Sequence, residues 1–258
     1  MNETITVDGL YKRYKLSRKQ QKLEKTKSSE KIALNGLSFN AYRGEVFGLL
    51  GPNGAGKTTT LRILSTLIAA DKGKATVDGF DVVSQSAEVR KRIGFLTSEL
   101  KLEDAFTPNY LFDFFGKLYK VEPAALAARK ALLFEKFGVD KYAEVKIAEL
   151  SSGMKQKTSL IMSIAHDPDI IIFDEPTNGL DLIAARDVTN FLIDQKALGK
   201  TILLSTHIFE LAEKLCDRVG IIMDGTMAAC GTLKDLTHDK SLENVFFDIY
   251  EQREKVSE

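Results

Sequence analysis

The sequence predicts an α/β protein with a parallel sheet, a second small sheet and an inserted helical segment, and three observations predict this class. The apolar run EVFGLL leads through a glycine-rich stretch, residues 51–59, into a helix-like segment. Two further apolar runs, at 169–175 and 201–207, flank another helix-like segment, as buried parallel strands do. Apolar residues also recur at three- and four-residue intervals over about 101–165, which indicates helices.

The N-terminal part of the chain has a strand-like pattern. The runs TITV, LSFNAY and KATVDGFDVV are bounded by DG, NG and RG turns, which predicts the small sheet. Between the first two runs, residues 15–31 carry seven basic and two acidic side chains and almost no apolar ones. We expect a solvated loop or hairpin there, with contact to anionic lipid or to a partner as the alternative.

Composition excludes some function classes. Lys plus Arg and Asp plus Glu both number 36, so the net charge gives no reason to expect a nucleic-acid partner. Cys216 and Cys230 form no C-x-x-C pair and the N-terminus shows no signal-peptide pattern, which favours a reducing cytosol and two buried thiols. No apolar run approaches the roughly 18 to 20 residues that cross a bilayer. We therefore expect no transmembrane segment, and any membrane role would depend on a partner.

The stretch GPNGAGKTT has the pattern and the strand–loop–helix context of a P-loop. Backbone N–H groups of such a loop converge on phosphate oxygens, and the helix N-terminus adds positive potential. We expect Lys57 to reach the β- and γ-phosphates and Thr58 to ligate Mg²⁺. The predicted contacts to ATP or GTP are Asn53, Gly54, Ala55, Gly56, Lys57, Thr58 and Thr59.

Two later apolar runs end in residues suited to nucleotide hydrolysis. Asp174 ends the first run and can hold Mg²⁺ through its water shell, while the neighbouring Glu175 is placed to act on the attacking water. His207 ends the second run. Because ligand sites gather at the carboxyl ends of parallel strands, we expect His207 to approach the γ-phosphate and that water.

The order GPNGAGKTT, LSSGMKQK, DIIIFDEPTNGLD and STH resembles that of the ATP-binding cassette subunits of ABC transporters, from Gly51 to His207 and in the flanking strands. The resemblance implies a RecA-like P-loop NTPase core, an antiparallel β subdomain and a helical subdomain at about 100–165. These parts would form an ATPase domain, residues 1–235, followed by a short extension, 236–258. It also implies a head-to-tail homodimer that holds two ATP molecules between the P-loop of one protomer and the signature of the other.

The signature of the family reads L-S-G-G-Q, whereas residues 150–154 here read L-S-S-G-M. The resemblance implies that a serine hydroxyl and backbone N–H groups at a helix N-terminus face the partner's γ-phosphate. Ser151 and Gly153 preserve both features. Ser152 keeps its N–H without glycine's freedom, and Met154 lacks the amide that would contact ribose. We interpret the change as specialisation, in which phosphate sensing is retained and the ribose contact is weakened.

Three further positions follow from the resemblance. The aromatic that stacks on adenine falls at Tyr14, with Tyr11 as a weaker candidate. Ser98 stands where the family's Q-loop glutamine should lie; it is too short to bridge Mg²⁺ and the membrane partner directly, although a water could substitute. Asp181 lies in PTNGLD, which resembles the D-loop, and is expected to report dimer closure and to cap the following helix.

The resemblance implies an ATP-hydrolysing subunit at the cytoplasmic face of the cell membrane that powers export through integral membrane permease subunits. The glycine-methionine signature followed by KQK, the missing Q-loop glutamine and the tail SLENVFFDIY are similar to NatA-type subunits of bacterial sodium exporters. Alternatives are export of a drug, lipid or polysaccharide, a soluble non-transport ABC ATPase, and a regulatory module without turnover. The chain has neither tandem cassettes nor long coiled coils, which argues against the soluble class, and Glu175 argues against the regulatory one.

Overall fold

The structure, a computed structural model, describes residues 2–23, 26–97 and 101–257, whose strands form two sheets. Both the small N-terminal sheet and the larger core sheet predicted from the sequence are present, and the run EVFGLL contributes to the larger one. The large sheet contains, in spatial order, β10 (Thr226–Thr232), β9 (Arg218–Met223), β3 (Val46–Leu50), β8 (Thr201–Thr206), β7 (Ile170–Asp174) and β6 (Ile93–Leu96). The small sheet contains β2 (Glu30–Tyr42), β1 (Glu3–Lys15), β4 (Lys72–Val77) and β5 (Phe80–Asp81).

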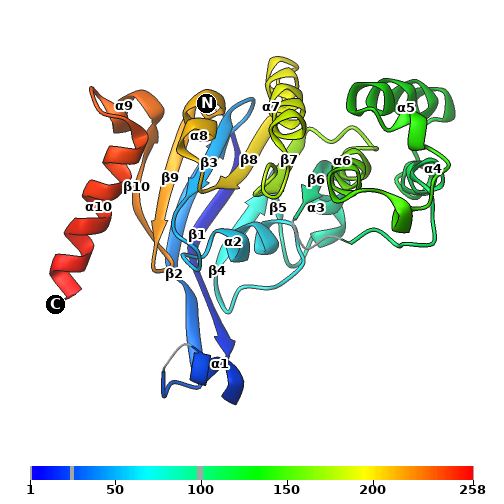
Figure 1. Ribbon diagram of the computed structural model, residues 1–258. Helices are drawn as coiled ribbons and strands as arrows, with labels where there is room; N and C mark the ends of the chain where they lie inside the picture. The colour runs from blue at the N-terminus through cyan, green and yellow to red at the C-terminus, as the bar shows by residue number, and fades with distance from the viewer. Residues whose placement is uncertain (1, 24–25, 98–100, 258) are drawn as a thin grey trace.

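The helices cover the large sheet and extend beyond both of its edges (Figure 1). Their bounds are α1 (Arg18–Leu23), α2 (Lys57–Leu64), α3 (Ser86–Arg92), α4 (Pro108–Leu118), α5 (Pro123–Phe137), α6 (Ser152–Ser163), α7 (Leu182–Ala197), α8 (Phe209–Leu215), α9 (Leu233–Thr237) and α10 (Leu242–Ser257), with short 3₁₀ helices at Asp140–Tyr142 and Ile147–Glu149. The helical segment expected at about 101–165 is therefore present as α4, α5 and α6. The α/β class predicted from the sequence is confirmed.

The central strands of the large sheet pair in parallel and are buried on both faces. Every residue of β3, β7 and β8 is buried, and these strands pair in parallel with each other and with β6 and β9. Strand β10 closes one edge in the antiparallel sense. Continuous apolar runs are typical of strands covered on both faces, which is why the sequence pattern predicted them.

Alternate residues of β3 face two separate parts of the core. Phe47 and Leu49 pack toward the small sheet and α2, whereas Val46 and Leu50 pack toward the helices on the other face. All four side chains are fully buried, and burial of a side chain such as Phe47 contributes about 1.5 to 3 kcal/mol. The P-loop, which follows β3, thus starts from a strand fixed on both faces.

A glycine turn between β9 and β10 joins the small sheet to the P-loop. Gly225 has a φ of +73°, and a Cβ on it would lie 2.8 Å from the carbonyl oxygen of Ala33. Its carbonyl accepts a hydrogen bond from Asn35 N at 2.8 Å, and its N–H donates to the carbonyl of Ala55 at 3.0 Å. Only glycine combines this left-handed backbone with so close an approach.

The described residues of the segment 15–31 include a helix that the sequence analysis did not predict. This is the helix α1, whose first turn carries a capping box: Gln20 N donates to Ser17 Oγ at 3.3 Å, and Ser17 N donates to Gln20 Oε1 at 2.8 Å. The expected hairpin is confirmed by the antiparallel pairing of Lys15 with Glu30, whereas the helix was not predicted, although the spacing Ser-x-x-Gln would have revealed its start. The hairpin that carries α1 projects from the body of the molecule (Figure 1).

The first half of α10 packs onto the core. Leu242 and Phe246 of α10 are buried, and the ring of Phe246 lies 5.1 Å from that of Phe209 on α8. The proposed division between residues 1–235 and 236–258 stays a prediction. Of the two cysteines, Cys216 is buried as expected, whereas Cys230 is exposed on the edge strand β10, so that the prediction of two buried thiols was half wrong.

A half-buried histidine lies at the junction of the helical segment and the large sheet. The ring of His166 stacks on Tyr119, with centroids 3.8 Å apart and planes 10° from parallel. Its Nε2 lies 3.1 Å from the carbonyl oxygen of Ile93, while its buried Nδ1 has no hydrogen-bond partner within the described ranges. Burial lowers the pKa of His166 to about 4, and the nearby charges of Arg129 and Lys200 act in the same direction.

This pKa predicts a loss of stability in mild acid. The unfolded histidine binds a proton near pH 6.5, while the folded one stays neutral down to about pH 4, so the free energy of unfolding falls as pH falls through this window. Between pH 7.5 and pH 5, the free energy of unfolding measured by urea denaturation should fall by about 1 to 2 kcal/mol less in His166→Gln than in the wild type. The exposed His238 provides the control, because His238→Gln should follow the wild type. Parallel profiles for wild type and His166→Gln would contradict the prediction.

Candidate functional site

The predicted hydrolytic residues follow the ends of three parallel strands at one edge of the large sheet. Leu50 of β3 pairs with Thr206 of β8, and Asp174 of β7 pairs with Ser205. The P-loop, Glu175 and His207 each follow the carboxyl end of one of these strands. The expectation that the three motifs meet at this edge is confirmed by the strand register.

The P-loop ends at a glycine that forms the N-cap of α2. Gly56 has a φ of +111°, and a Cβ on it would lie 2.6 Å from the carbonyl oxygen of Ala33. Lys57 follows as the first residue of α2, and only 6% of its side chain is exposed. Its ammonium donates to the carbonyl oxygens of Gly51 and Pro52 at 2.6 and 3.3 Å. The loop thus wraps around this ammonium.

The charge of Lys57 faces two carboxylates. Its Nζ lies 3.7 Å from Glu175 Oε1. Burial lowers the pKa of Lys57, whereas the charges of Glu175 and Asp174 favour the ammonium form and limit that shift. The carboxylates therefore help to keep a cation at the position where a P-loop binds phosphate.

Asp174 and Glu175 are held by the neighbouring strand. Ser205 Oγ donates to Asp174 Oδ1 at 2.5 Å, and Asp174 is 3% exposed. The N–H of Glu175 lies 3.1 Å from both the carbonyl oxygen and the Oγ of Ser205. His207 Nδ1 lies 2.8 Å from Glu175 Oε2. Glu175 thus contacts Lys57 through one carboxylate oxygen and His207 through the other.

A pocket of about 490 Å³ brings most of the predicted residues together. It is lined by Tyr14, Lys31, Ala33, Pro52, Asn53, Gly54, Gly56, Lys57, Thr58, Thr59, Glu175, Asn178 and His207. Among the predicted contacts, Ala55 is buried behind the loop and Asp174 lines a neighbouring cavity instead. Sequence reasoning missed Lys31, Ala33 and Asn178, of which Lys31 had been assigned to the basic loop.

Of the two tyrosine candidates for the adenine contact, Tyr14 lies in the pocket wall and Tyr11 does not. Tyr14 lines the pocket, is 37% exposed, and places its hydroxyl 3.5 Å from Thr59 Oγ1. Tyr11 does not line it, and its ring lies 5.7 Å from the ammonium of Lys72. Tyr14 thus lies in the wall of the pocket beside the P-loop. Its stacking role stays a prediction.

The signature stretch begins helix α6 and lies outside this pocket. Ser151 is the N-cap and its Oγ accepts a hydrogen bond from Met154 N at 3.3 Å. Ser152 is the first helical residue and has no left-handed φ, so its backbone does not require glycine. The side chain of Met154 packs against the apolar core. The serine and methionine are therefore compatible with a regular helix start, and the interpretation as specialisation with a weakened ribose contact stays a prediction.

A second cavity, of about 530 Å³, connects the signature helix with the hydrolytic residues. Ser152 and Gln156 line it on one side, and Glu175 and Asn178 on the other. Beyond it, Asp181 is the N-cap of α7, as predicted, and its Oδ1 accepts from Ala184 N at 2.8 Å. Ser98, the predicted substitute for the Q-loop glutamine, lies outside the described residues.

Comparison with known proteins places these motifs in a family. Residues 34–178 match the sequence family described as ABC transporter. The chain is 41% identical over 214 residues to ABC transporter ATP-binding protein NatA of Bacillus subtilis, covering 83% of this chain and 87% of that protein. It is 36% identical over 232 residues to daunorubicin resistance ATP-binding protein DrrA3 of Streptomyces coeruleorubidus, covering 90% and 69% of the two chains.

Solved structures agree with the fold. One described as the ATP-binding subunit of an ABC transporter superposes with a TM-score of 0.84 at 27% identity and covers 96% of this chain and 99% of its own. A dimeric, post-hydrolysis ATP-binding cassette bound to ADP and Pi shares the fold, with a TM-score of 0.76 at 22% identity over 89% of this chain and 98% of its own. Together with the sequence matches, these findings confirm the RecA-like P-loop core and show that the chain belongs to the ABC transporter family as an ATPase subunit.

Proposed function

We propose that this protein hydrolyses ATP at the cytoplasmic face of the cell membrane and so powers export through separate permease subunits. Sodium is the first cargo that we consider. The position of Glu175 is the observation that carries the proposal. Its carboxylate lies in the nucleotide pocket between the ammonium of Lys57 and the imidazole of His207. A base in this position can act on a water beside a phosphate that the P-loop holds.

Each side chain has a defined task in the proposed hydrolysis. Glu175 accepts the proton of the attacking water, and His207 holds that carboxylate and the γ-phosphate in place. Lys57 neutralises the charge that develops on the phosphate oxygens. Tyr14 stacks on adenine at the other end of the pocket. The distances of 3.7 and 2.8 Å around Glu175 support this division of roles.

The residues present fit a magnesium ion with the nucleotide. Thr58 lines the pocket and the buried carboxylate of Asp174 lies at the end of β7, so a hydroxyl and a carboxylate supply the hard oxygen ligands that Mg²⁺ prefers. Thr58 would ligate the ion directly and Asp174 through its water shell. When bound, the ion neutralises charge on the β- and γ-phosphates. Ser98 stays a predicted contributor.

Two copies of the chain would complete two ATP sites. The signature residues do not line the pocket of their own chain, while Ser151 and Ser152 are exposed at the N-terminus of the twelve-residue helix α6. We propose that Ser151 and the N–H groups of Ser152, Gly153 and Met154 meet the γ-phosphate held by a second protomer. Asp181, at the start of α7, would report the closure of this homodimer to the opposite site.

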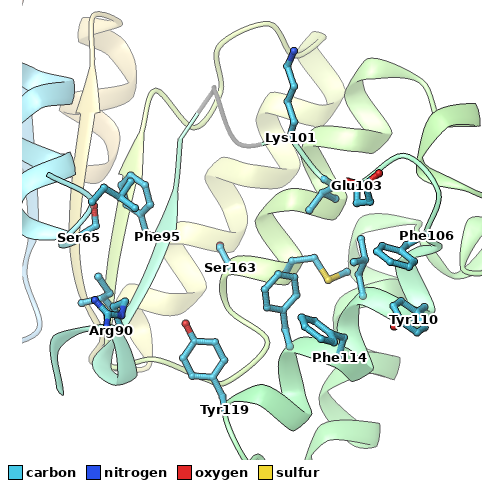
Figure 2. A pocket seen from close by; sticks show the side chains of 16 residues that line it. Ser65, Arg90, Phe95, Lys101, Glu103, Phe106, Tyr110, Phe114, Tyr119 and Ser163 are labelled. Carbon is cyan, nitrogen blue, oxygen red and sulfur yellow. The ribbon is translucent and has the colours of Figure 1, made fainter. Parts of the chain in front are cut away.

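An apolar pocket offers the surface for the membrane partner (Figure 2). It has a volume of about 480 Å³ and lies between Phe95 of β6 and the aromatic side chains of α4 and the preceding loop. Phe106, Tyr110 and Phe114 stack in a row along it and are 38, 51 and 49% exposed. Within the described part of the chain, no helix is long and apolar enough to cross a membrane. A permease segment is the occupant that we propose for this exposed apolar surface.

Sodium is the cargo that we propose first, because the signature, Q-loop and tail resemble those of NatA-type sodium exporter subunits. Other relatives are named for different cargoes: one is the Nod factor export ATP-binding protein I of Burkholderia lata, 40% identical over 202 residues, and DrrA3 is named for daunorubicin resistance. An oligosaccharide, lipid or drug is therefore the second candidate. The cargo depends on the permease.

Reconstitution tests the proposal directly. The protein and the permease encoded beside its gene are placed in liposomes, and ATP-dependent sodium movement is followed together with phosphate release. We expect sodium flux from the wild type and from Glu88→Gln, a surface carboxylate control paired with Lys91, and none from Glu175→Gln. Turnover without sodium flux would discard sodium and leave drugs, lipids and polysaccharides. Absence of turnover in every sample would reject the hydrolytic function.

A further inference from the structure

A side chain of the signature helix reaches the segment that carries the hydrolytic glutamate. Gln156, on the second turn of α6, donates from Nε2 to the carbonyl oxygen of Pro176 at 3.3 Å. Pro176 directly follows Glu175 in the chain. One hydrogen bond thus links the helix that begins at Ser151 with the residue next to the proposed base.

The backbone at Glu175 needs such support. Its φ is +52°, a left-handed value that residues with a side chain rarely adopt, and the proline after it restricts its backbone further. The N–H of Glu175 donates to the carbonyl oxygen of Ser205, and the carbonyl oxygen of Glu175 accepts from Asn178 N at 3.1 Å. Pro176 has no N–H, so its carbonyl is the one backbone hydrogen-bonding group through which this residue can be held.

A second contact ties α6 to the same region. Lys157 Nζ lies 2.7 Å from Asp187 Oδ2 on α7, with the two side chains 13 and 35% exposed. The segment from Pro176 to Asp187 is therefore attached to α6 near both of its ends. The signature helix and the residues after Glu175 also face each other across the 530 Å³ cavity. A shift of α6 cannot leave that segment unaffected.

We propose that Gln156 is a positioning residue that aligns Glu175 and transmits the state of one ATP site to the other. The inference rests on the proposed dimer, in which Ser151 touches the nucleotide of the opposite protomer while Glu175 acts on the nucleotide of its own. When Ser151 contacts the γ-phosphate held by the other protomer, the N-terminus of α6 is fixed in position. Gln156 then holds the Pro176 carbonyl, and Glu175 stays in its left-handed conformation against Lys57 and His207.

Gln156→Leu removes the donor and keeps a side chain of similar size. Loss of one hydrogen bond that positions the base should lower kcat about 10-fold, with little change in the KM for ATP. The Hill coefficient for ATP should fall from above one to about one, because the sites lose their connection. Ser159→Ala is the matched control: Ser159 lines the same cavity, and its Oγ donates to the carbonyl of Lys155 on its own helix. Ser159→Ala should keep the wild-type kcat, KM and Hill coefficient.

Gln156→Glu separates the donated hydrogen bond from the size of the side chain. Its carboxylate, ionised at pH 8, has nearly the size of the amide but cannot donate to the Pro176 carbonyl, so kcat should fall as in Gln156→Leu while the KM for ATP stays near the wild-type value. Wild-type kcat and Hill coefficient in Gln156→Leu, or wild-type kcat in Gln156→Glu, would overturn the inference. A wild-type protein without turnover would instead reject the proposed function.

Discussion

Glu175→Gln is expected to bind ATP like the wild type and to release phosphate at least about 100-fold more slowly. General-base catalysis contributes about 10²- to 10⁴-fold, and an amide of the same size cannot accept the proton of the attacking water. The Lys57 ammonium keeps its hydrogen bonds to the carbonyl oxygens of Gly51 and Pro52 in this variant, and Asp174 still favours its charged form. Steady-state phosphate release and binding of a fluorescent ATP analogue measure the two effects separately.

Glu88→Gln provides the comparison, because Glu88 pairs with Lys91 and Arg92 on the surface helix α3. It should turn over ATP at the wild-type rate. If Glu175→Gln released phosphate as fast as this control, Glu175 would not be the base, and the proposal that ATP is hydrolysed in this pocket would lose its main support.

Lys57→Met should weaken ATP binding about 100-fold and abolish turnover at millimolar ATP. The ammonium is buried, donates to carbonyl oxygens of the P-loop, and belongs to a side chain that lines the pocket where it would meet two phosphates. Hydrogen bonds to charged groups contribute about 1.5 to 3 kcal/mol each, so loss of about 3 kcal/mol corresponds to about 100-fold in Kd. Methionine fills a similar volume, and titration calorimetry with ATP measures the loss.

Lys240→Met is the matched control, because Lys240 pairs with Asp248 at an exposed position near α10. Its Kd should equal that of the wild type. Thermal unfolding without nucleotide shows whether Lys57→Met is still folded. A folded Lys57→Met that bound ATP with wild-type affinity would exclude a phosphate contact for this lysine.

Much of the fold and of the pocket could be predicted because the decisive residues lie at strand ends. The P-loop, Glu175 and His207 each follow an apolar run, and parallel pairing carries the ends of such runs to one edge. Local sequence therefore determined their relative positions. The same reasoning identified Asp181 as a helix cap, which the hydrogen bond from Ala184 N confirms.

The remaining contacts depend on register and on distant packing. Lys31 reaches the pocket because it pairs with Tyr14 across the β1–β2 ladder, whose register shifts at several irregularities that no local pattern reveals. Ser152 was read as a loss of glycine's freedom, but that freedom matters only at a left-handed φ, which Ser152 does not have. Gln156 and Pro176 are far apart in sequence, so their hydrogen bond required the packed structure.

The nucleotide pocket draws its walls from both sheets. Tyr14, Lys31 and Ala33 reach it from the small sheet, and the P-loop reaches it from the large one. A nucleotide bound there touches both, so any fluctuation that parts the sheets must first break ligand contacts, and the free energy of that opening rises with nucleotide concentration. ATP bound in this pocket would therefore stabilise the contact between the two sheets, and each round of hydrolysis and product release would remove that stabilisation until the next ATP binds.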